Sequence, residues 1–408
     1  MLRLLKKESV HTYNSFNVLV LSVVTLLLIS PLFSLLKGIS TSITFLLFTI
    51  SIFLNFNRKE RFLKYYLVLV CYYIFISIVL TVFHQEASFM LLPFFFLTSV
   101  YFVLVSSNND IAKFVDVSTN IIFLITIGAF FGFFYAFFFG QPTFVFKNPN
   151  GLENQVFLTT MTNSRWGNFI RPSGIYDEPG ALSFFICGIC YIRHLLNFDK
   201  KRTRLILFLG LITFSVAHVI YLAFHLISDT KFKINISLLK KSFYFIFILL
   251  SIYFILLFTG TWEWISLVFF GRFQSENSGL FPGDNRSMYF FNALDYISQH
   301  PLNILFGESM KTNFDNISFD YGVVGSNPLM PILSFGVLIS LPYYLILFLL
   351  FISIIKGRKY FASIGFALVL FQREFFLVVS YSMIFILLFR ILYINLINEK
   401  KGINSIWN

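Results

Sequence analysis

The stretch Ile121-Ile-Phe-Leu-Ile-Thr-Ile-Gly-Ala-Phe-Phe-Gly-Phe-Phe-Tyr-Ala-Phe-Phe-Phe139 runs without a charged residue. About 20 apolar residues in a helix are enough to cross a bilayer core of roughly 30 Å. Similar runs recur along the whole chain, which is 57% hydrophobic and only 12% charged. A soluble protein does not carry so many apolar runs. The sequence therefore predicts an all-α polytopic integral membrane protein with a single integral membrane domain over residues 1–408.

The apolar runs give the expected membrane segments. One of them, 205–227, lies between two basic loops that should share a compartment, although a single crossing would separate them. We therefore expect 205–227 to break near Ser215, Ala217 and His218 into two short helices, which is allowed where protein covers the freed backbone groups. With that break the chain has about 12 transmembrane helical segments. The apolar runs lie at 16–36, 39–56, 65–83, 90–105, 114–139, 179–197, 205–227, 242–260, 327–355, 360–371 and 375–395.

The formal net charge of +12 is best explained by topology. Most Lys and Arg residues form short clusters between apolar runs, and such clusters mark cytoplasmic loops. This favours membrane insertion over nucleic-acid binding. Both termini are then cytoplasmic, and the two long polar loops 140–178 and 261–326 lie together on the extracytoplasmic face. Long loops in compact domains usually carry function, and these two hold most of the cations outside the cytoplasm, Arg171, Arg272 and Arg286 among them.

The end of the first loop is a charged, turn-rich motif, Arg171-Pro-Ser-Gly-Ile-Tyr-Asp-Glu-Pro-Gly-Ala-Leu-Ser183. Pro179 suits the first position of a helix, and Asp177 and Glu178 fall at or before its N-cap. In one interpretation both acids only cap a helix over 179–197, and Arg171 is a stop-transfer charge. In the other, the acids fix Arg171 or a substrate hydroxyl, and the exposed helix start helps to receive an anion.

The second loop carries Gly283-Asp-Asn-Arg286 followed by apolar residues at helical spacing. This pattern predicts an amphipathic helix near 286–299 that lies at the membrane interface. Simple membrane adhesion would explain such a helix, with Arg286 as a solvated end charge. Against that, Arg286 opens the helix on the same face as Arg171, and paired arginines suit multidentate capture of a diphosphate.

Three motifs together resemble a known family. They are Arg171-Pro-Ser-Gly with Asp177-Glu-Pro-Gly180, then Gly283-Asp-Asn-Arg286 with Pro301 and Gly307, and finally Gly325-Ser-Asn-Pro328 with Gly336. In layout and in these positions the chain resembles the O-antigen polymerase (Wzy-type) members of the O-antigen ligase and polymerase superfamily. The resemblance covers most of the chain in layout but few positions in detail.

That resemblance implies a glycosyltransferase of the bacterial cytoplasmic (inner) membrane, working in lipopolysaccharide biosynthesis. Its substrates would be oligosaccharide repeat units linked to undecaprenyl diphosphate, with the active site outside the cytoplasm and a chain-length regulator as a further partner. On the family pattern, Arg171 and Arg286 hold the diphosphate, and Glu178 orients Arg171 or touches the acceptor. We add Arg272, Tyr176, Asp177 and Asn327 as substrate-binding candidates.

The acceptor hydroxyl needs a base, and the candidates are Glu178, Glu276, Asp284 and Asp320, with Glu178 ranked first. The sequence has no Asp-x-Asp pair and no His/Cys/Asp cluster with ligand spacing, so we expect a site without a metal or other cofactor. Two alternatives stay open. One alternative is an O-antigen ligase. Ligase members commonly carry His where this chain has Ser326, and this difference weakens the ligase hypothesis. A flippase for lipid-linked oligosaccharides would place charges inside the spans.

Overall fold

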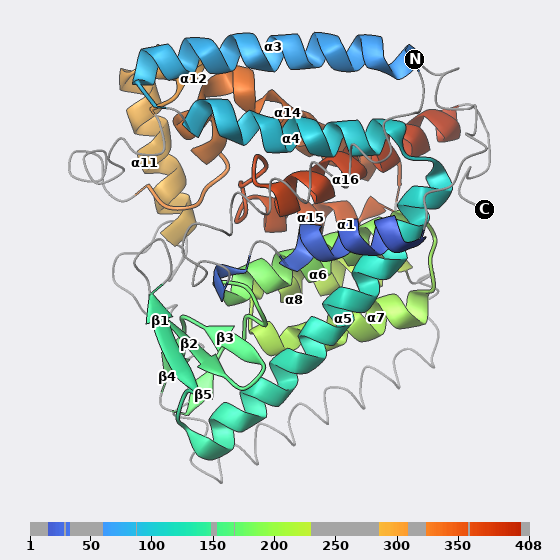
Figure 1. Cartoon of the computed structure of the whole chain (residues 1–408), viewed down its shortest axis with the longest axis vertical. Helices are drawn as coiled ribbons and strands as arrows, with labels where there is room; N and C mark the ends of the chain where they lie inside the picture. The colour runs from blue at the N-terminus through green and yellow to red at the C-terminus, as the bar shows by residue number, and fades with distance from the viewer. Residues whose placement is uncertain are drawn as a thin grey trace.

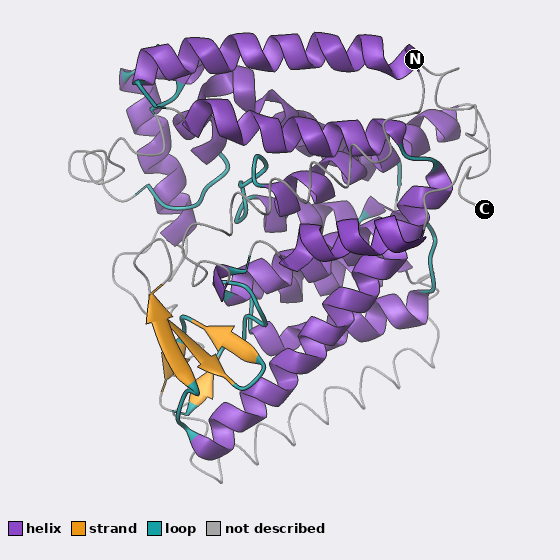
Figure 2. Ribbon diagram, viewed as in Figure 1, coloured by secondary structure: helices purple, strands orange, loops and turns teal. Residues whose placement is uncertain are grey.

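A computed structural model describes residues 15–27, 30–32, 60–86, 88–147, 153–166, 168–229, 285–308, 324–357 and 360–400. These residues are mostly helical, with a small group of strands at one end of the bundle (Figures 1 and 2). The expected segments 39–56 and 242–260, and most of the loop 261–326, lie outside the described residues. The described helices are α1 (Ser15–Leu27), α3 (Glu60–His84), α4 (Ser88–Val105), α5 (Asn108–Phe139), α6 (Pro179–Leu195), α7 (Lys200–Leu209), α8 (Val216–Asp229), α11 (Asn285–Gln299), α12 (Asn303–Phe306), α14 (Met330–Ile355), α15 (Ala362–Leu370) and α16 (Val379–Lys400).

Four described helices contain a segment long and apolar enough to cross a membrane: Tyr66–His84, Asn108–Phe139, Met330–Ile355 and Ser380–Ile397. Shorter apolar helices accompany them, at Asn17–Leu27, Phe96–Val105, Pro179–Leu195 and Val216–Asp229. The described part of the chain is therefore a mostly helical membrane protein, as its composition predicts. The count of twelve segments stays a prediction.

Helix α6 is the central element of the bundle. It packs against α5, α8, α15 and α16, and every residue from Ala181 to Arg193 is buried. A helix that is apolar all round must be covered on all sides, and the packing partners of α6 provide this cover; Figure 1 shows α6 near the middle of the bundle. Its 17 residues span roughly 25 Å at 1.5 Å per residue. The two ends of α6 therefore lie on opposite sides of the bundle.

Helix α5 begins and ends where its sequence dictates. At its start, the Ser107 hydroxyl accepts from Asp110 N at 3.1 Å, and Ser107 N donates to the Asp110 carboxylate at 3.0 Å. This reciprocal pair is a capping box. At its end, Gly140 adopts φ 71°, a left-handed conformation that glycine accepts without strain, and its N–H bonds to Ala136 O at 2.8 Å. The chain then turns into the strands.

The expected break in 205–227 is present. Helix α7 ends at Leu209, a 3₁₀ turn covers Gly210–Thr213, and α8 begins at Val216. Phe214, between the two helices, has φ 49°. The break lies slightly earlier than the sequence predicts, so Ser215 belongs to it while Ala217 and His218 already lie in α8.

The segment 140–178 connects α5 to α6, and it contains short strands that we did not predict from the sequence. It forms a three-stranded antiparallel sheet and a separate two-stranded one. Hydropathy over long windows misses such strands because each has only two to five residues, although Phe, Val and Thr favour them. The first sheet contains β1 (Phe144–Lys147), β2 (Glu153–Phe157) and β3 (Thr160–Thr162), and the second contains β4 (Arg165–Trp166) and β5 (Phe169–Ile170).

The strands pack on the end of α5. Ala136 of the helix forms a buried cluster with Phe157 and Ile170 from the strands. Close approach depends on Gly132, because a Cβ built there would lie 2.6 Å from Phe157 O. One turn earlier, a Cβ at Gly128 would meet its nearest atom, Thr159 O, at 3.5 Å, an ordinary contact.

Helices α11 and α12 cover the start of α14. The helix predicted over 286–299 is confirmed as α11, whereas its position at a membrane interface stays a prediction. Gly336 interrupts α14 with φ 70°, and Gly307, which follows α12, lies against it. A Cβ on Gly307 would come within 2.6 Å of Gly336 N. Two glycines from separate motifs of the sequence therefore meet at one close backbone contact.

The α5–sheet contact yields a stability prediction. We expect Gly132→Ala to lower the free energy of unfolding by about 1–3 kcal/mol, because the added methyl group forces the helix away from the Phe157 carbonyl. Gly128→Ala is the matched control and should be neutral or slightly stabilising, since alanine favours helix by roughly 1 kcal/mol over glycine. The thermal midpoint of the detergent-purified protein measures both. Equal midpoints for the two variants would contradict this packing.

Candidate functional site

The motif at 171–180 is attached to the sheet before it enters α6. Ser173 N donates to Met161 O at 2.9 Å, and Met161 N donates to Gly174 O at 2.7 Å, so this segment pairs with β3 like an additional short strand. The Ser173 hydroxyl adds a bond to Met161 O at 2.8 Å. Gly174 has φ 62°, which explains the glycine at this position. These hydrogen bonds therefore fix the backbone that leads to Asp177 and Glu178 at the start of α6.

Arg171 contacts the break between α7 and α8. Its Nε donates to Thr213 O at 3.3 Å, and its Nη2 donates to Phe214 O at 3.1 Å. A helix end exposes carbonyl groups without intrahelical partners, and in an apolar bundle such groups need protein donors. Arg171 supplies them. It is thus part of the internal structure and is not merely a stop-transfer charge at a loop end.

Glu178 forms an ion pair with Arg373, from the connection between α15 and α16. Glu178 is the N-cap residue of α6 and Pro179 follows at the first helical position, as the sequence predicts, yet the Glu178 side chain makes no capping hydrogen bond. The interpretation in which this acid only caps the helix is therefore wrong. The Arg373 side chain is 10% exposed and that of Glu178 is 37% exposed, so the pair lies at the rim of the buried region.

Gly180 makes room for this ion pair. A Cβ built on Gly180 would overlap the Arg373 guanidinium group. The sequence Glu178-Pro179-Gly180 now has a physical explanation: an acid for the arginine, a proline to start the helix, and a glycine over which the guanidinium group lies.

Asp177 is the second acid of the cluster. Burial raises its pKa above the ordinary value, and the neighbouring Glu178 raises it further, while Arg373 opposes both effects. Burial alone would lower the pKa of Arg373, but Tyr381 and Glu178 nearby outweigh it and the net shift is upward. The cluster therefore combines a permanently charged guanidinium group with an ion-paired acid, Glu178, and a buried acid, Asp177, whose pKa is raised.

Other predicted site residues have local structural roles. The Tyr176 ring is 0% exposed and stacks on Phe185, with ring centroids 4.8 Å apart, so it belongs to the core. Asn327 is also buried; its Nδ2 donates to Gly325 O at 2.8 Å, and its Oδ1 accepts from Leu329 N at 2.8 Å. It shapes the turn into α14.

The remaining predicted residues are only partly covered by the description. Arg286 is the second residue of α11, but its side chain lies outside the described part of the structure, as do Arg272, Glu276, Asp284 and Asp320 entirely. The pairing of Arg171 with Arg286 across a diphosphate therefore stays a prediction.

Sequence reasoning missed Arg373 and its neighbour Glu374. Both residues are buried, at 8% and 6% exposure. The available indication was the pair Arg373-Glu374 between the apolar runs 360–371 and 375–395, because charges inside apolar hairpins are costly and usually functional. Only the fold shows that Arg373 reaches the start of α6.

Comparisons with known protein families, with curated proteins and with solved structures find no match to this chain.

The ion pair predicts a non-additive response to mutation. Glu178→Gln leaves the buried Arg373 charge without its ion-pair partner. Arg373→Gln removes the positive charge that screens the neighbouring acids. Each variant should therefore destabilise the protein. Breaking a buried pair costs about 3–5 kcal/mol, and the partial exposure of Glu178 should bring the cost below that range. The double variant should be more stable than the sum of the singles implies, with a coupling of about 1–3 kcal/mol.

Thermal midpoints in detergent measure this cycle. Lys147→Ala, which removes an exposed cation from β1, is the control and should behave like the wild type. Additivity within about 0.5 kcal/mol would show that the two side chains do not interact.

Proposed function

We propose that this protein is a membrane glycosyltransferase, an O-antigen polymerase of the bacterial inner membrane. It transfers a growing glycan from undecaprenyl diphosphate to a lipid-linked repeat unit at the extracytoplasmic face. The observation that carries this proposal is the cluster of Asp177, Glu178 and Arg373 at the start of a wholly buried apolar helix. Charges in such a place are costly, and they are typical of a site that handles a charged substrate.

The chemistry suits a diphosphate leaving group. As the glycosidic bond to the diphosphate breaks, negative charge grows on the departing oxygen. A fixed guanidinium group in a partly dehydrated site stabilises that charge without reorganisation, and its planar fork matches phosphate oxygens. Arg373 is held in place by Glu178 and Gly180, and the N-terminus of α6 adds its backbone N–H groups and positive dipole end. We therefore add Arg373 to Arg171 and Arg286 as a candidate diphosphate ligand.

The two acids, Glu178 and Asp177, have different roles in the proposed mechanism. An acid that is paired with an arginine is stabilised in its charged form and accepts a proton poorly, so Glu178 acts as a brace for Arg373. Asp177, whose pKa is raised by burial, is the better general base for the acceptor hydroxyl. This assignment reverses our sequence-based ranking, in which Glu178 came first.

The topology that accompanies this proposal has about twelve membrane segments and both termini in the cytoplasm. The strands, α11 and the start of α6 then face outward, and a chain-length regulator would act on this side. The rival functions are an O-antigen ligase and a flippase for the same lipid-linked glycan.

Deleting the gene separates these three functions. Loss of a polymerase should leave single repeat units attached at the cell surface. Loss of a ligase should leave polymer on the lipid carrier, and loss of a flippase should trap the lipid-linked unit in the cytoplasmic leaflet. Gel separation of surface and lipid-linked glycans by size reads all three outcomes.

Site variants test the cluster itself. Arg373→Lys keeps the charge but loses the planar fork, and we expect at least a tenfold loss of long glycan chains. The Glu178→Gln/Arg373→Gln double variant should regain stability but make no polymer, with a loss of about 10²-fold or more. Lys147→Ala should make normal chains. Normal chain lengths from the double variant at wild-type protein levels would eliminate this site.

The pH dependence tests the base. A general base works only when deprotonated, so polymerisation in membrane vesicles should rise with pH through the pKa of Asp177, above the ordinary aspartate range. Asp177→Asn should abolish this rise together with most activity, whereas Glu178→Gln should keep the rise at a lower rate and shift it to lower pH, because Glu178 raises the pKa of Asp177. An unchanged pH profile in Asp177→Asn would refute the assignment.

A further inference from the structure

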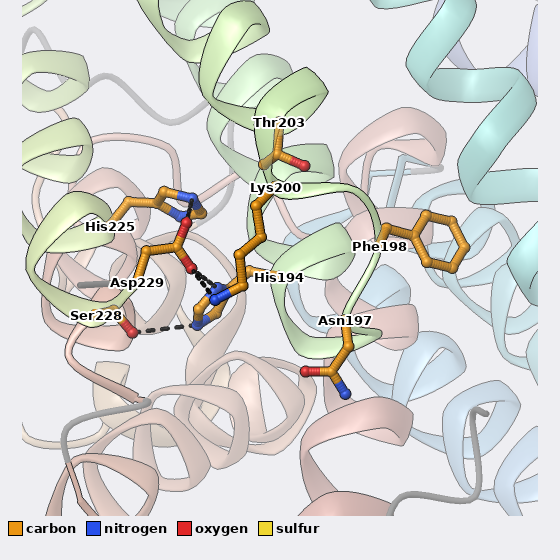
Figure 3. A pocket seen from close by; sticks show the side chains of 8 residues that line it. All are labelled: His194, Asn197, Phe198, Lys200, Thr203, His225, Ser228 and Asp229. Atoms are coloured by element: carbon orange, nitrogen blue, oxygen red, sulfur yellow. Dashed lines mark hydrogen bonds and ion pairs between the residues drawn. The ribbon is translucent and has the colours of Figure 1, made fainter. Parts of the chain in front are cut away.

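Two histidines and an aspartate converge at the opposite end of α6 from the charged cluster. His194 lies on the last turn of α6, about 24 Å along the helix from Glu178. His225 and Asp229 lie one turn apart on α8, so they share a face of that helix. Figure 3 shows the three side chains pointing toward one another. Their potential ligand atoms all lie within 4.8 Å of one another.

The spacing between each histidine and Asp229 is close to that of metal ligands. His194 Nδ1 lies 3.3 Å from Asp229 Oδ1, and His225 Nε2 lies 3.7 Å from Asp229 Oδ2. Ligands with bonds of about 2.0–2.1 Å around tetrahedral zinc lie roughly 3.3 Å apart. The side chains of His225 and Asp229 are each 1% exposed. His225 Nε2 has no hydrogen-bond partner and faces Asp229. A buried ring nitrogen without a partner beside a carboxylate indicates a missing ligand.

Neighbouring side chains already orient all three groups. His194 Nε2 lies 3.1 Å from Ser228 Oγ, and the other ring nitrogen, Nδ1, is directed toward Asp229. His225 Nδ1 lies 3.3 Å from the Tyr221 hydroxyl, which likewise leaves Nε2 directed inward. Arg204 Nε donates to Asp229 Oδ2 at 3.1 Å. Metal-binding histidines and carboxylates characteristically make such outer hydrogen bonds, which fix the tautomer and the ring orientation.

The Lys200 ammonium group occupies a place beside Asp229 that a metal ion could take. Its Nζ lies 3.1 Å from Asp229 Oδ1, and Figure 3 shows it reaching into the cluster. The Lys200 side chain is 57% exposed, so it leaves at little cost when another cation arrives. A cavity of about 170 Å³ adjoins the cluster, lined in part by Asn197 and Phe198, and it provides room for a water ligand.

We propose that His194, His225 and Asp229 bind one divalent transition metal ion, with zinc-like coordination and a water in the fourth position. Two imidazoles favour such metals over calcium or magnesium. The metal ties the end of α6 to the end of α8, far from the charged cluster, and it is independent of the proposed glycosyltransferase activity. We found no metal-ligand spacing in the sequence because we overlooked His225 and Asp229. These residues are four positions apart, which places them on one face of a helix.

The test is metal titration of the full-length protein in detergent, purified without a polyhistidine tag and stripped with chelator. We expect one Zn²⁺ per chain by calorimetry, and Co²⁺ should give the visible absorption of a tetrahedral site. His225→Ala and Asp229→Asn should each weaken binding by at least 10–100-fold. His300→Ala, a histidine on the connection between α11 and α12, is the control and should bind as the wild type does.

Lys200→Met keeps the test decisive even where a buried variant fails to fold, because Lys200 is exposed. Removing the competing ammonium group should tighten binding about two- to fivefold. The proposal is overturned by wild-type protein that binds no Zn²⁺, by undiminished binding in folded His225→Ala or Asp229→Asn, or by Lys200→Met binding no tighter than the wild type.

Discussion

Every charged or unpaired polar group in this bundle must find its partner inside the protein, because hydrocarbon offers none. Arg171 meets this requirement by donating to Thr213 and Phe214, the carbonyl groups that the helix break leaves without partners. Arg373 meets it through Glu178. Both arginines converge on elements that touch α6, so the broken helix, the strands and the α15–α16 connection are held in register by charge-assisted bonds. Apolar packing alone would fix these elements less specifically.

The central helix makes the two ends of the molecule chemically different. Its interior is buried and apolar, whereas an acid–arginine cluster lies at its start and a His–Asp cluster near its end. At the start, carboxylates meet a guanidinium group that cannot lose its proton. At the other end, two imidazole rings meet a carboxylate that also contacts Lys200 and Arg204. The first arrangement suits recognition of an anion, and the second suits binding of a cation.

Local rules predicted local features. Pro179 begins α6, the run 205–227 is broken, and 286–299 is a helix, because proline geometry, charge distribution and helical periodicity act over a few residues. The strands were missed because two to five residues do not register in a hydropathy window. Arg373 was missed for a different reason. It lies 195 residues from Glu178, and no spacing rule connects positions that only the packing of α15 and α16 on α6 brings together.

The adjacency of Asp177 and Glu178 illustrates why sequence alone left their roles open. As neighbours they share the same helix start and the same local dipole, which affects both in the same direction. Their surroundings differ, because Arg373 ion-pairs with Glu178, whereas burial and the neighbouring Glu178 raise the pKa of Asp177 although Arg373 opposes this. A single distant residue thus gives two adjacent carboxylates different surroundings. Pairs of acids in different environments are characteristic of acid–base sites, and the raised pKa of Asp177 is the physical basis for our proposal that it accepts the proton.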